Sequence, residues 1–554
     1  MPKIEKILLI IGAAAVFLGL SYAAAGPIYS DEMMYIDIAL RNYQMPSYGN
    51  RIFHVYLQKL FLAIFPTPLM GIKVFWSFLM TATMVMAYLL ARKITDKSTA
   101  LHGILALVFF FSFPIFVEFS GEPAVDITAM AMVMAYITVY FAAVRDPSRE
   151  KTAVFILGVL AFLCLKTKET TIFVHIMLLG LVVNQQKPWV DWKRVWDLAK
   201  RFLLGAAAGI GLMIVLDGLI LGNPFFSISP ATFGEIFTHY DYPSAFYNGP
   251  ASWYEIYFLD ELITPFMLFL MAGALWQGKM DLKRKLIWIF PMIYAAFVSL
   301  NMLIIPWGFI ERFYFPALPV VAALAPQAIR FSWPKEKKEW IGFALSLAAI
   351  VGLVLVMRTV WIDFSRSIYF DYGRMLDSVY FPVLLSLLFG AVIFIKGERW
   401  YHALIQLFCV VSLMMTPVLT SYKYFVTYPR VQEKYDALFY PFETYREELK
   451  EFDRAFYYST TIKRQEDMLS ADPNDIIGMF NFFFDGRIER ENIIMGYDQA
   501  EMPVALLTQD FSHALLTAHD VDYLRAQDAL GEVQDTFEII SADPHGKIIL
   551  LVRK

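Results

Sequence analysis

Residues 201–221 read RFLLGAAAGIGLMIVLDGLIL, a run long and apolar enough to cross the hydrocarbon core of a bilayer as one α-helix. Similar runs recur along most of the chain. Of its 554 residues, 58% are hydrophobic and only 18% are charged, and the mean hydropathy is +0.51. This apolar share is far above that of soluble domains. The sequence therefore predicts an integral membrane protein.

Windows of about 20 apolar residues predict a polytopic, all-α membrane domain with about 13 transmembrane helices. The candidate spans lie near residues 5–25, 69–91, 98–117, 124–144, 152–165, 171–184, 201–221, 263–277, 286–305, 313–330, 340–357, 379–395 and 400–419. The fifth and sixth spans are short, and the charged hairpin Lys166-Thr167-Lys168-Glu169 joins them. Short spans with charges at their apex indicate a protein-lined cavity.

Glycine spacing in and after residues 201–221 predicts close contacts between helices. Gly205 and Gly209 are four residues apart, as are Gly218 and Gly222. Such pairs form a flat helix surface on which another backbone can approach closely. We expect these glycines to serve packing rather than a binding site.

The distribution of Lys and Arg predicts a cytoplasmic N-terminus. Basic residues concentrate in the loops that this orientation places inside, for example in residues 279–285. An odd number of spans then leaves the tail outside, and we expect a bacterial or archaeal plasma or inner membrane. A cleaved signal peptide is the alternative for the first span, because Lys3 and Lys6 precede an apolar stretch that ends in three alanines. Either reading leaves residues 26–68 outside.

Three predicted outer segments are longer than simple connectors: residues 26–68, 222–262 and 358–378. Within the first, residues 53–65 have the pattern of an amphipathic helix lying in the membrane interface, with Gln58 and Lys59 on its polar side. Aromatic residues are frequent in the second segment, as is typical at headgroup level. We expect both segments to rest on the membrane surface.

The composition changes near residue 426 to that of a soluble domain. We therefore expect a membrane domain over residues 1–425 and a small extracytoplasmic α/β domain over residues 426–554. In the tail, residues 475–484 follow a helix-start signal, and residues 536–540 and 547–552 resemble a β-hairpin.

Charge and motif content exclude several function classes. Lys and Arg total 47 against 51 for Asp and Glu, a formal charge of −4, so no basic excess favours nucleic acid as a partner. The two cysteines form neither a disulfide framework nor a zinc or iron–sulfur motif. The sequence contains no Walker glycine loop, no nucleophile elbow and no His-Glu-x-x-His motif. No motif requires a metal centre or a cofactor, and the dependence on a divalent cation stays open.

Carboxylates lie at the outer ends of predicted spans, where ionisable groups are costly and therefore functional candidates. Asp31 and Glu32 follow the first span directly. Glu122 and Asp126 stand four residues apart at the start of the fourth span, where they could share one helical face. The simpler interpretation of both pairs is capping of helix N-termini. The acids could also bind a divalent cation, although no ligand spacing requires one.

Basic and polar side chains are predicted on the same side of the membrane as these acids. They form three groups: Arg51 with His54, Lys166 and Lys168 with Glu169, and Arg312 with Tyr314. Any single cation could merely extend to lipid headgroups. Their common side favours a shared cavity in which acids and cations meet.

Such a cavity suits the transfer of a sugar from a lipid phosphate to a hydroxyl. The leaving phosphate gains charge as the sugar bond breaks, and Lys and Arg stabilise that charge. The acceptor hydroxyl loses a proton, for which an ionised Asp is a suitable general base. Neither step needs a redox cofactor or a nucleotide.

At these residues the sequence resembles the GT-C class of integral-membrane glycosyltransferases, in the branch of the protein O-mannosyltransferases and the lipid A aminoarabinose transferase. The landmarks occur in the family's order: Asp31-Glu32 with Tyr35, Ile38 and Ala39; Arg51 to His54; Glu122 to Asp126; Lys166 to Glu169; and Glu311 to Pro316 with Pro319. The resemblance covers about residues 5–330 by motif and the remainder by architecture.

The resemblance implies an inverting transfer, on the extracytoplasmic side, from a polyprenyl or dolichyl phosphate linked to one sugar. It implies that Asp31 is the general base and that Asp126 or Glu122 assists it or orients the acceptor. The donor phosphate would be held by Arg51, Lys168 and Arg312, with Lys166 and Tyr314 beside them, while Glu32, His54 and Glu169 line the cavity.

The sequence also departs from these relatives. It lacks the paired prolines that follow the basic residue in the aminoarabinose enzyme, the repeated outer modules of eukaryotic protein mannosyltransferases, and the Trp-Trp-Asp motif of oligosaccharyltransferases. Two rival interpretations remain: a secondary transporter or lipid-linked sugar flippase, and a ligase or polymerase that uses diphosphate-linked donors. The sugar, the acceptor (a glycan, lipid or protein), the lipid length and the oligomeric state stay open.

Overall fold

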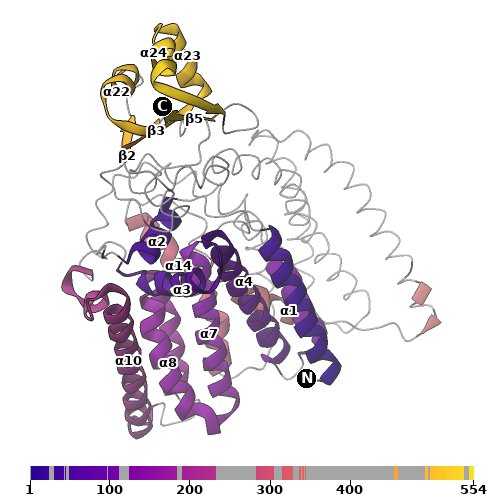
Figure 1. Cartoon of the computed structure of the whole chain (residues 1–554). Coiled ribbons are helices and arrows are strands. Elements are labelled where there is room, and N and C mark those ends of the chain that lie inside the picture. The colour runs from indigo at the N-terminus through magenta and orange to yellow at the C-terminus, as the bar shows by residue number, and fades with distance from the viewer. Residues whose placement is uncertain are drawn as a thin grey trace.

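In a computed structural model of the chain, the described residues are 2–23, 30–42, 44, 49–95, 98–111, 124–183, 190–232, 282–304, 315–328, 336–337, 340–341, 344, 455–459, 493–496, 500–541 and 548–554. Up to residue 328 they are almost entirely helical, and after residue 454 they form a sheet with three helices (Figure 1). The expected order, a helical domain followed by an α/β domain, is therefore present.

The helical part contains α-helices and shorter 3-10 helices, labelled η. Their bounds are α1 Lys3–Ala23, α2 Ser30–Arg41, α3 Ile52–Ile64, α4 Pro68–Lys93, α5 Ala100–Phe111, α7 Val125–Arg145, η3 Pro147–Arg149, α8 Glu150–Leu165, η4 Glu169–Met177, α9 Leu178–Val182, α10 Trp192–Leu221, η5 Phe226–Ile228, α14 Leu282–Ile304, α15 Leu318–Leu324 and η9 Ala325–Ala328.

Among the described residues, four helices are long and apolar enough to cross a membrane: α1, α4, α7 and α10. They confirm the spans predicted near residues 5–25, 69–91, 124–144 and 201–221. Five further predicted spans coincide with other helices, namely α5, α8, η4 with α9, α14 and α15. The spans predicted at 263–277, 379–395 and 400–419, and nearly all of 340–357, lie outside the described residues. The total of about 13 spans therefore stays a prediction.

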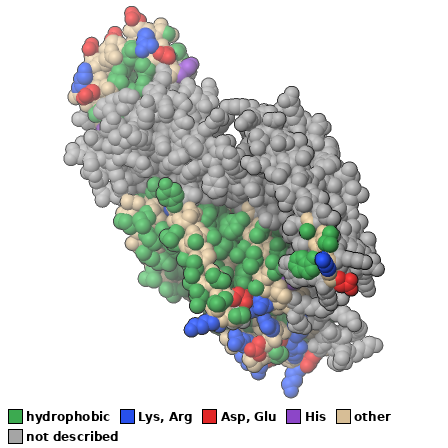
Figure 2. Space-filling model, turned by 90° about the vertical axis from the view of Figure 1, so that its right-hand side faces the viewer, with side chains coloured by type: hydrophobic (Ala, Val, Ile, Leu, Met, Phe, Trp, Pro, Cys, Tyr) green, Lys and Arg blue, Asp and Glu red, His purple; other side chains and the backbone are tan. Residues whose placement is uncertain are grey.

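The surface of the helical part is suited to a bilayer. Figure 2 shows hydrophobic side chains over a wide area of the described helices, with Lys, Arg, Asp and Glu gathered at one end of that area. On α10 the exposed side chains include Leu203, Leu204, Leu212, Val215 and Leu219. Leucine and valine exposed in a row along one helix are stable against lipid tails and not against water.

Local sequence fixes the ends of the long helices. At the start of α10, the Asp191 carboxylate accepts the backbone N–H groups of Lys193 at 3.1 Å and Arg194 at 3.3 Å. The helix ends at Gly222, whose φ of 68° lies in the left-handed region that glycine adopts without strain. The helix therefore begins at Trp192, nine residues or about two and a half turns before the predicted start at residue 201.

Helices α8 and α10 approach each other at glycines. A Cβ added to Gly205 would lie 1.9 Å from the carbonyl oxygen of Phe155, and one added to Gly158 would lie 2.1 Å from that of Phe202. The packing role predicted for Gly205 is therefore confirmed. Gly209 also faces α8, with an added Cβ 3.0 Å from the carbonyl oxygen of Val159. The second predicted pair differs, because Gly222 ends the helix instead of packing within it.

The return segment after α8 is a nine-residue 3-10 helix, η4, followed by the five-residue α9. A 3-10 helix rises about 2.0 Å per residue, compared with about 1.5 Å in an α-helix. The nine residues of η4 therefore span about 18 Å rather than about 14 Å. Because of this winding, the short segment formed by η4 and α9 has about the same length along its axis as α8.

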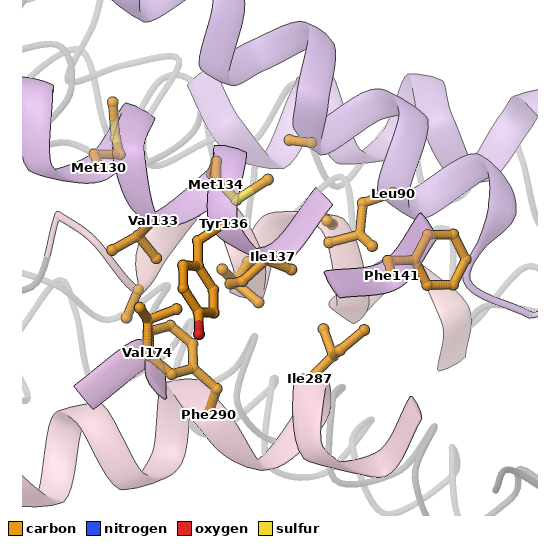
Figure 3. Packing of buried hydrophobic residues seen from close by; sticks show 14 of the residues in the cluster. Leu90, Met130, Val133, Met134, Tyr136, Ile137, Phe141, Val174, Ile287 and Phe290 are labelled. Carbon is orange, nitrogen blue, oxygen red and sulfur yellow. The ribbon is translucent and has the colours of Figure 1, made fainter. Parts of the chain in front are cut away.

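A large hydrophobic core lies between α4, α5, α7, α14 and α15. Its most deeply buried members include Met130, Val133, Tyr136, Ile137 and Phe290. In Figure 3 the Tyr136 ring from α7 points toward Val174 of η4 and Phe290 of α14. Packing of α14 on η4 and α7 fixes the position of η4, whose first residue lies in the candidate site described below.

Helix α3 has the predicted extent, but Gln58 on its predicted polar side does not face solvent. Its first half is buried on all sides, and Gln58, expected on the polar face, is fully buried. Leu60 and Ile64 are largely exposed, as expected of apolar side chains that face lipid. The prediction for Gln58 is wrong because its amide has a partner inside the protein, the Glu32 carboxylate.

The C-terminal part is a five-stranded sheet in the order β2-β1-β3-β5-β4. The elements are β1 Ala455–Ser459, β2 Ile493–Gly496, α22 Met502–Thr508, β3 Phe511–Thr517, α23 Ala518–Ala526, α24 Leu530–Thr536, β4 Phe537–Ser541 and β5 Ile548–Arg553. Strands β2, β1 and β3 are parallel, whereas β5 pairs antiparallel with β3 and β4. The predicted pairing of residues 536–540 with 547–552 is confirmed; the helix predicted at 475–484 lies outside the described residues.

Candidate functional site

Four segments bring polar and charged side chains together within the helical part: α2, the first half of α3, the first turn of α7, and the turn at residues 166–168 between α8 and η4. In Figure 1, α2 and α3 lie at the end of the helical part that is nearer to the C-terminal sheet. Most of the charged side chains described here are buried, although ionisable groups are rarely buried without a partner. Each is held by a specific contact.

Glu32 joins three helices. Its Oε1 accepts the backbone N–H of Val125, the first residue of α7, at 2.6 Å. Its Oε2 accepts the Gln58 side-chain amide at 3.1 Å and lies 3.2 Å from Nε2 of His54, both from α3. The neighbouring N-cap residue of α7, Ala124, makes no side-chain bond. A carboxylate from α2 therefore supplies the cap and a negative charge at the positive end of α7.

His54 connects Glu32 to α7 through its second nitrogen. Its Nδ1 lies 2.7 Å from the hydroxyl oxygen of Thr128. An ionised carboxylate only accepts hydrogen bonds, so Nε2–H donates to Glu32, and in the neutral imidazole the Thr128 hydroxyl donates to Nδ1. The imidazole is fully buried and contacts the Tyr35 and Phe75 rings. The tautomer is thus set by its two partners.

Asp126 and Lys168 form a buried ion pair. The Lys168 ammonium donates to Oδ1 of Asp126, and both side chains are almost inaccessible to solvent. Asp126 lies in the first turn of α7, and Lys168 immediately precedes η4. The capping interpretation of Asp126 is not needed, because its carboxylate pairs with a cation. Two candidate residues far apart in sequence are therefore in direct contact.

Arg51 stands at the start of α3 and reaches two other segments. Its guanidinium donates to the Tyr35 hydroxyl at 2.6 Å and lies 3.5 Å from Oε1 of Glu169. The Arg51 side chain keeps 18% of its surface exposed and that of Glu169 keeps 31%. This pair is thus the solvent-facing part of the site.

Lys166 lies deeper than Lys168. Its ammonium donates weakly to the Asn50 side-chain oxygen at 3.5 Å, and its backbone oxygen accepts the N–H of Phe53 at 3.0 Å. Burial lowers the pKa of Lys166 to about 8, and the nearby Asp217 carboxylate opposes that shift. The turn between α8 and η4 is therefore tied to α3 through both main chain and side chain.

The structure brings together Glu32, Arg51, His54, Asp126, Lys166, Lys168 and Glu169 from the predicted set. Asp31 lies in the first turn of α2, but its side chain is outside the described part of the chain, as are Glu122, Arg312 and Tyr314. The roles predicted for these four residues stay predictions.

Sequence reasoning missed several residues of this region, notably Tyr35, Thr128 and Asp217. Asp217 carried a usable signal, because it is an acid inside a predicted membrane span. The other two are uncharged and gave none. Within the described residues, no group of three or more His, Cys, Asp and Glu side chains could hold a metal ion.

Comparisons with known proteins relate this arrangement to known folds and families. Residues 50–216 match the family model described as dolichyl-phosphate-mannose-protein mannosyltransferase. The crystal structure of ArnT from Cupriavidus metallidurans in the apo state is similar with a TM-score of 0.56 and 12% identity, covering 98% of this chain and 97% of that one. ArnT bound to undecaprenyl phosphate is similar with a TM-score of 0.52 and 13% identity, over the same shares of both chains. A search of curated protein sequences finds no match.

At these identities the structural likeness shows the fold alone, and that fold extends over nearly the whole chain. The matched family segment contains most of the described site, from Arg51 and His54 to Lys168 and Asp126. The chain thus has the fold of ArnT with a mannosyltransferase-like segment at the site, which confirms its resemblance to the GT-C class of membrane glycosyltransferases and to the ArnT-like branch.

Proposed function

We propose that the protein transfers a single sugar from a polyprenyl-phosphate donor to a hydroxyl acceptor on the outer face of the membrane, with inversion at the anomeric carbon. The acceptor oxygen bonds to that carbon as the bond to the phosphate oxygen breaks. The acceptor proton passes to a carboxylate, and polyprenyl phosphate leaves as the anion. The acceptor class is a glycan, lipid or protein carrying a hydroxyl.

The observation that carries this proposal is the buried contact of Asp126 with Lys168 beside the more exposed Arg51. A buried ammonium next to an accessible guanidinium is suited to an anion that enters from the solvent side. The similar ArnT structure is bound to undecaprenyl phosphate, which supports a polyprenyl phosphate as the carrier.

We assign the general base to Asp31 rather than to Glu32. The oxygens of Glu32 already face the Val125 N–H, the Gln58 amide and His54. These three partners occupy both oxygens of the Glu32 carboxylate, which leaves it poorly placed to reach an acceptor hydroxyl. Asp31 is its immediate neighbour in the first turn of α2, and Asp126 or Glu122 would assist it or orient the acceptor.

The donor phosphate would be held by Arg51, Lys168 and Arg312, with Lys166 and Tyr314 in supporting positions. We further propose that residues 1–425 form the membrane domain, that residues 426–554 form an extracytoplasmic domain covering the cavity, and that the N-terminus is cytoplasmic. This orientation brings lipid-linked donor and acceptor to the same face.

The experiment is a donor panel with the purified protein in lipid nanodiscs, without any gradient. Undecaprenyl and dolichyl monophosphates carrying different single sugars are offered with hydroxyl acceptors, and release of the lipid phosphate is measured. Diphosphate-linked donors form the second arm. We expect release from a monophosphate donor in wild type, and weaker donor binding after Arg312→Ala.

Release from diphosphate donors alone would identify a ligase or polymerase instead. Movement of the intact lipid-linked sugar across the membrane without release would identify a flippase or transporter. Unchanged donor affinity in Arg312→Ala would show that Arg312 only anchors the protein at the headgroups.

A further inference from the structure

Asp217 is an acid inside a candidate membrane span that the proposed reaction does not use. It lies four residues before the end of α10, and its side chain is fully buried. A carboxylate within a membrane helix is costly and is kept where a specific arrangement of partners compensates for it.

Three hydrogen bonds satisfy the Asp217 carboxylate. Its Oδ1 accepts the Tyr56 hydroxyl at 2.5 Å and the Ser227 hydroxyl at 2.7 Å, and its Oδ2 accepts the Ser227 backbone N–H at 2.8 Å. The donors come from α3 and from η5, the short helix after α10. The carboxylate therefore links the outer end of α10 to two segments that are separate in sequence.

Helix α3 is held on two sides as a result. His54 and Gln58 bind Glu32 of α2, whereas Tyr56 binds Asp217 of α10. Residues two apart on a helix point in nearly opposite directions, so the two sets of bonds fix the rotation of α3 about its axis. That rotation sets the direction of Arg51 at the start of the helix.

Asp217 also acts on the turn that carries the two lysines. Its negative charge attracts Lys166, whose backbone oxygen binds α3 through Phe53. Lys168 is two residues further along the same turn. The Asp217 carboxylate thus interacts with both segments that supply cations to the candidate site, α3 and the 166–168 turn. It makes no described bond with the Asp126–Lys168 pair itself.

We propose that Asp217 is a positioning residue: through Tyr56 and Lys166 it holds α3 and the 166–168 turn in the geometry in which Arg51 and Lys168 bind a polyprenyl phosphate. This inference rests on the proposed function for its ligand. It assigns Asp217 no contact with the donor.

The test compares Tyr56→Phe, Asp217→Asn and their combination with wild type. Tyr88→Phe is the matched control, because the Tyr88 hydroxyl also donates to a carboxylate, that of Glu5 at 2.9 Å, but between α1 and the far end of α4. Affinity for undecaprenyl phosphate alone and the midpoint of thermal unfolding are measured for each. Hydrogen exchange of residues 52–58 is measured in the absence of lipid.

We expect Tyr56→Phe and Asp217→Asn each to weaken binding about tenfold, the size of one lost hydrogen bond to a charged group. The combination should weaken it no more than the stronger single change, because both act through one contact. Exchange of residues 52–58 should rise in these variants and stay at the wild-type rate in Tyr88→Phe.

Lower thermal midpoints with unchanged lipid affinity would overturn the inference, because Asp217 would then only stabilise the fold. Absence of undecaprenyl phosphate binding in wild type would instead count against the proposed function. In that case faster exchange of residues 52–58 in both variants still supports the positioning of α3, and unchanged exchange overturns it.

Discussion

The carboxylate of Glu32 accepts the backbone N–H of Val125 at 2.6 Å, so an acid from α2 caps a helix that begins 93 positions later in the chain. The same carboxylate holds two side chains of α3. Three helices are therefore joined at one buried charge, next to the Asp126 that pairs with Lys168. The first turn of α7 therefore contains both the N–H group that Glu32 caps and the acid of the candidate site.

Replacing Glu32 by Ala should destabilise the protein more than replacing it by Gln. Alanine leaves the Val125 N–H and the Gln58 amide without their acceptor, which we expect to lower the free energy of unfolding by roughly 2 to 4 kcal/mol. Glutamine keeps an acceptor oxygen for Val125 and should cost less than half as much. Unfolding in detergent measures both, and equal losses would argue against the cap.

Replacing Asp31 by Asn should abolish turnover and leave donor affinity nearly intact. The amide cannot accept the proton of the acceptor hydroxyl, but it preserves the size of the side chain. Single-turnover kinetics and donor titration separate the two effects. A variant with the wild-type rate would remove Asp31 from the role of general base.

Lys168→Met should lose both stability and donor binding, whereas the double variant Lys168→Met with Asp126→Asn should recover stability alone. The single change leaves the Asp126 charge buried without its cation, at a cost of about 3 to 5 kcal/mol. The double change removes both charges. Arg525→Met is the control, because its pair with Asp522 is exposed and should matter by less than about 1 kcal/mol. Donor binding restored in the double variant would contradict the role of Lys168.

Gly205→Ala should destabilise the helical part, whereas Gly211→Ala on the same helix should not. An added methyl at Gly205 meets a backbone oxygen at 1.9 Å, and forcing the helices apart should cost about 1 to 3 kcal/mol. At Gly211 nothing lies within 4 Å of an added Cβ, so the higher helix propensity of alanine should stabilise by up to about 1 kcal/mol. Thermal unfolding of both variants gives the comparison.

The stability of wild type should rise with pH above about 8 through Lys166. Burial lowers the pKa of this lysine from 10.5 to about 8, so between these values the unfolded chain binds more protons than the folded one. The free energy of unfolding therefore increases with pH across this window, as the buried charge is relieved. Lys166→Met should remove that contribution, and Lys93→Met, at an exposed position, should retain it. Identical pH slopes in wild type and Lys166→Met would contradict this.

Features that depend on one stretch of sequence were predictable, and pairings between distant stretches were less so. Hydropathy located α4 and α7 to within a few residues, because a span needs only a continuous apolar run. Asp126 and Lys168 could be grouped from the sequence, because both lie at ends of predicted spans on the same side of the membrane. The contact between Glu32 and α7 could not be read from either segment.

Gln58 shows why the remaining predictions failed. A polar residue on an otherwise apolar helix is expected to face water. Gln58 is buried instead because Glu32 from another helix accepts its side-chain amide. Asp217 was overlooked for a similar reason: its donors, Tyr56 and Ser227, lie 161 and 10 positions away and carry no charge. Nothing in the sequence around Tyr56 or Ser227 predicts an acid as the hydrogen-bond partner.

The touching backbones of α8 and α10 have a consequence at a distance. Gly205 lies twelve residues before Asp217, or about 18 Å along the helix axis, and Gly158 lies eight residues before Lys166, or about 12 Å. A larger side chain at either glycine would push the two helices apart, and with them the Asp217 carboxylate and the Lys166 ammonium. The spacing of these two opposite charges therefore depends on two glycines that lie two to three helical turns away.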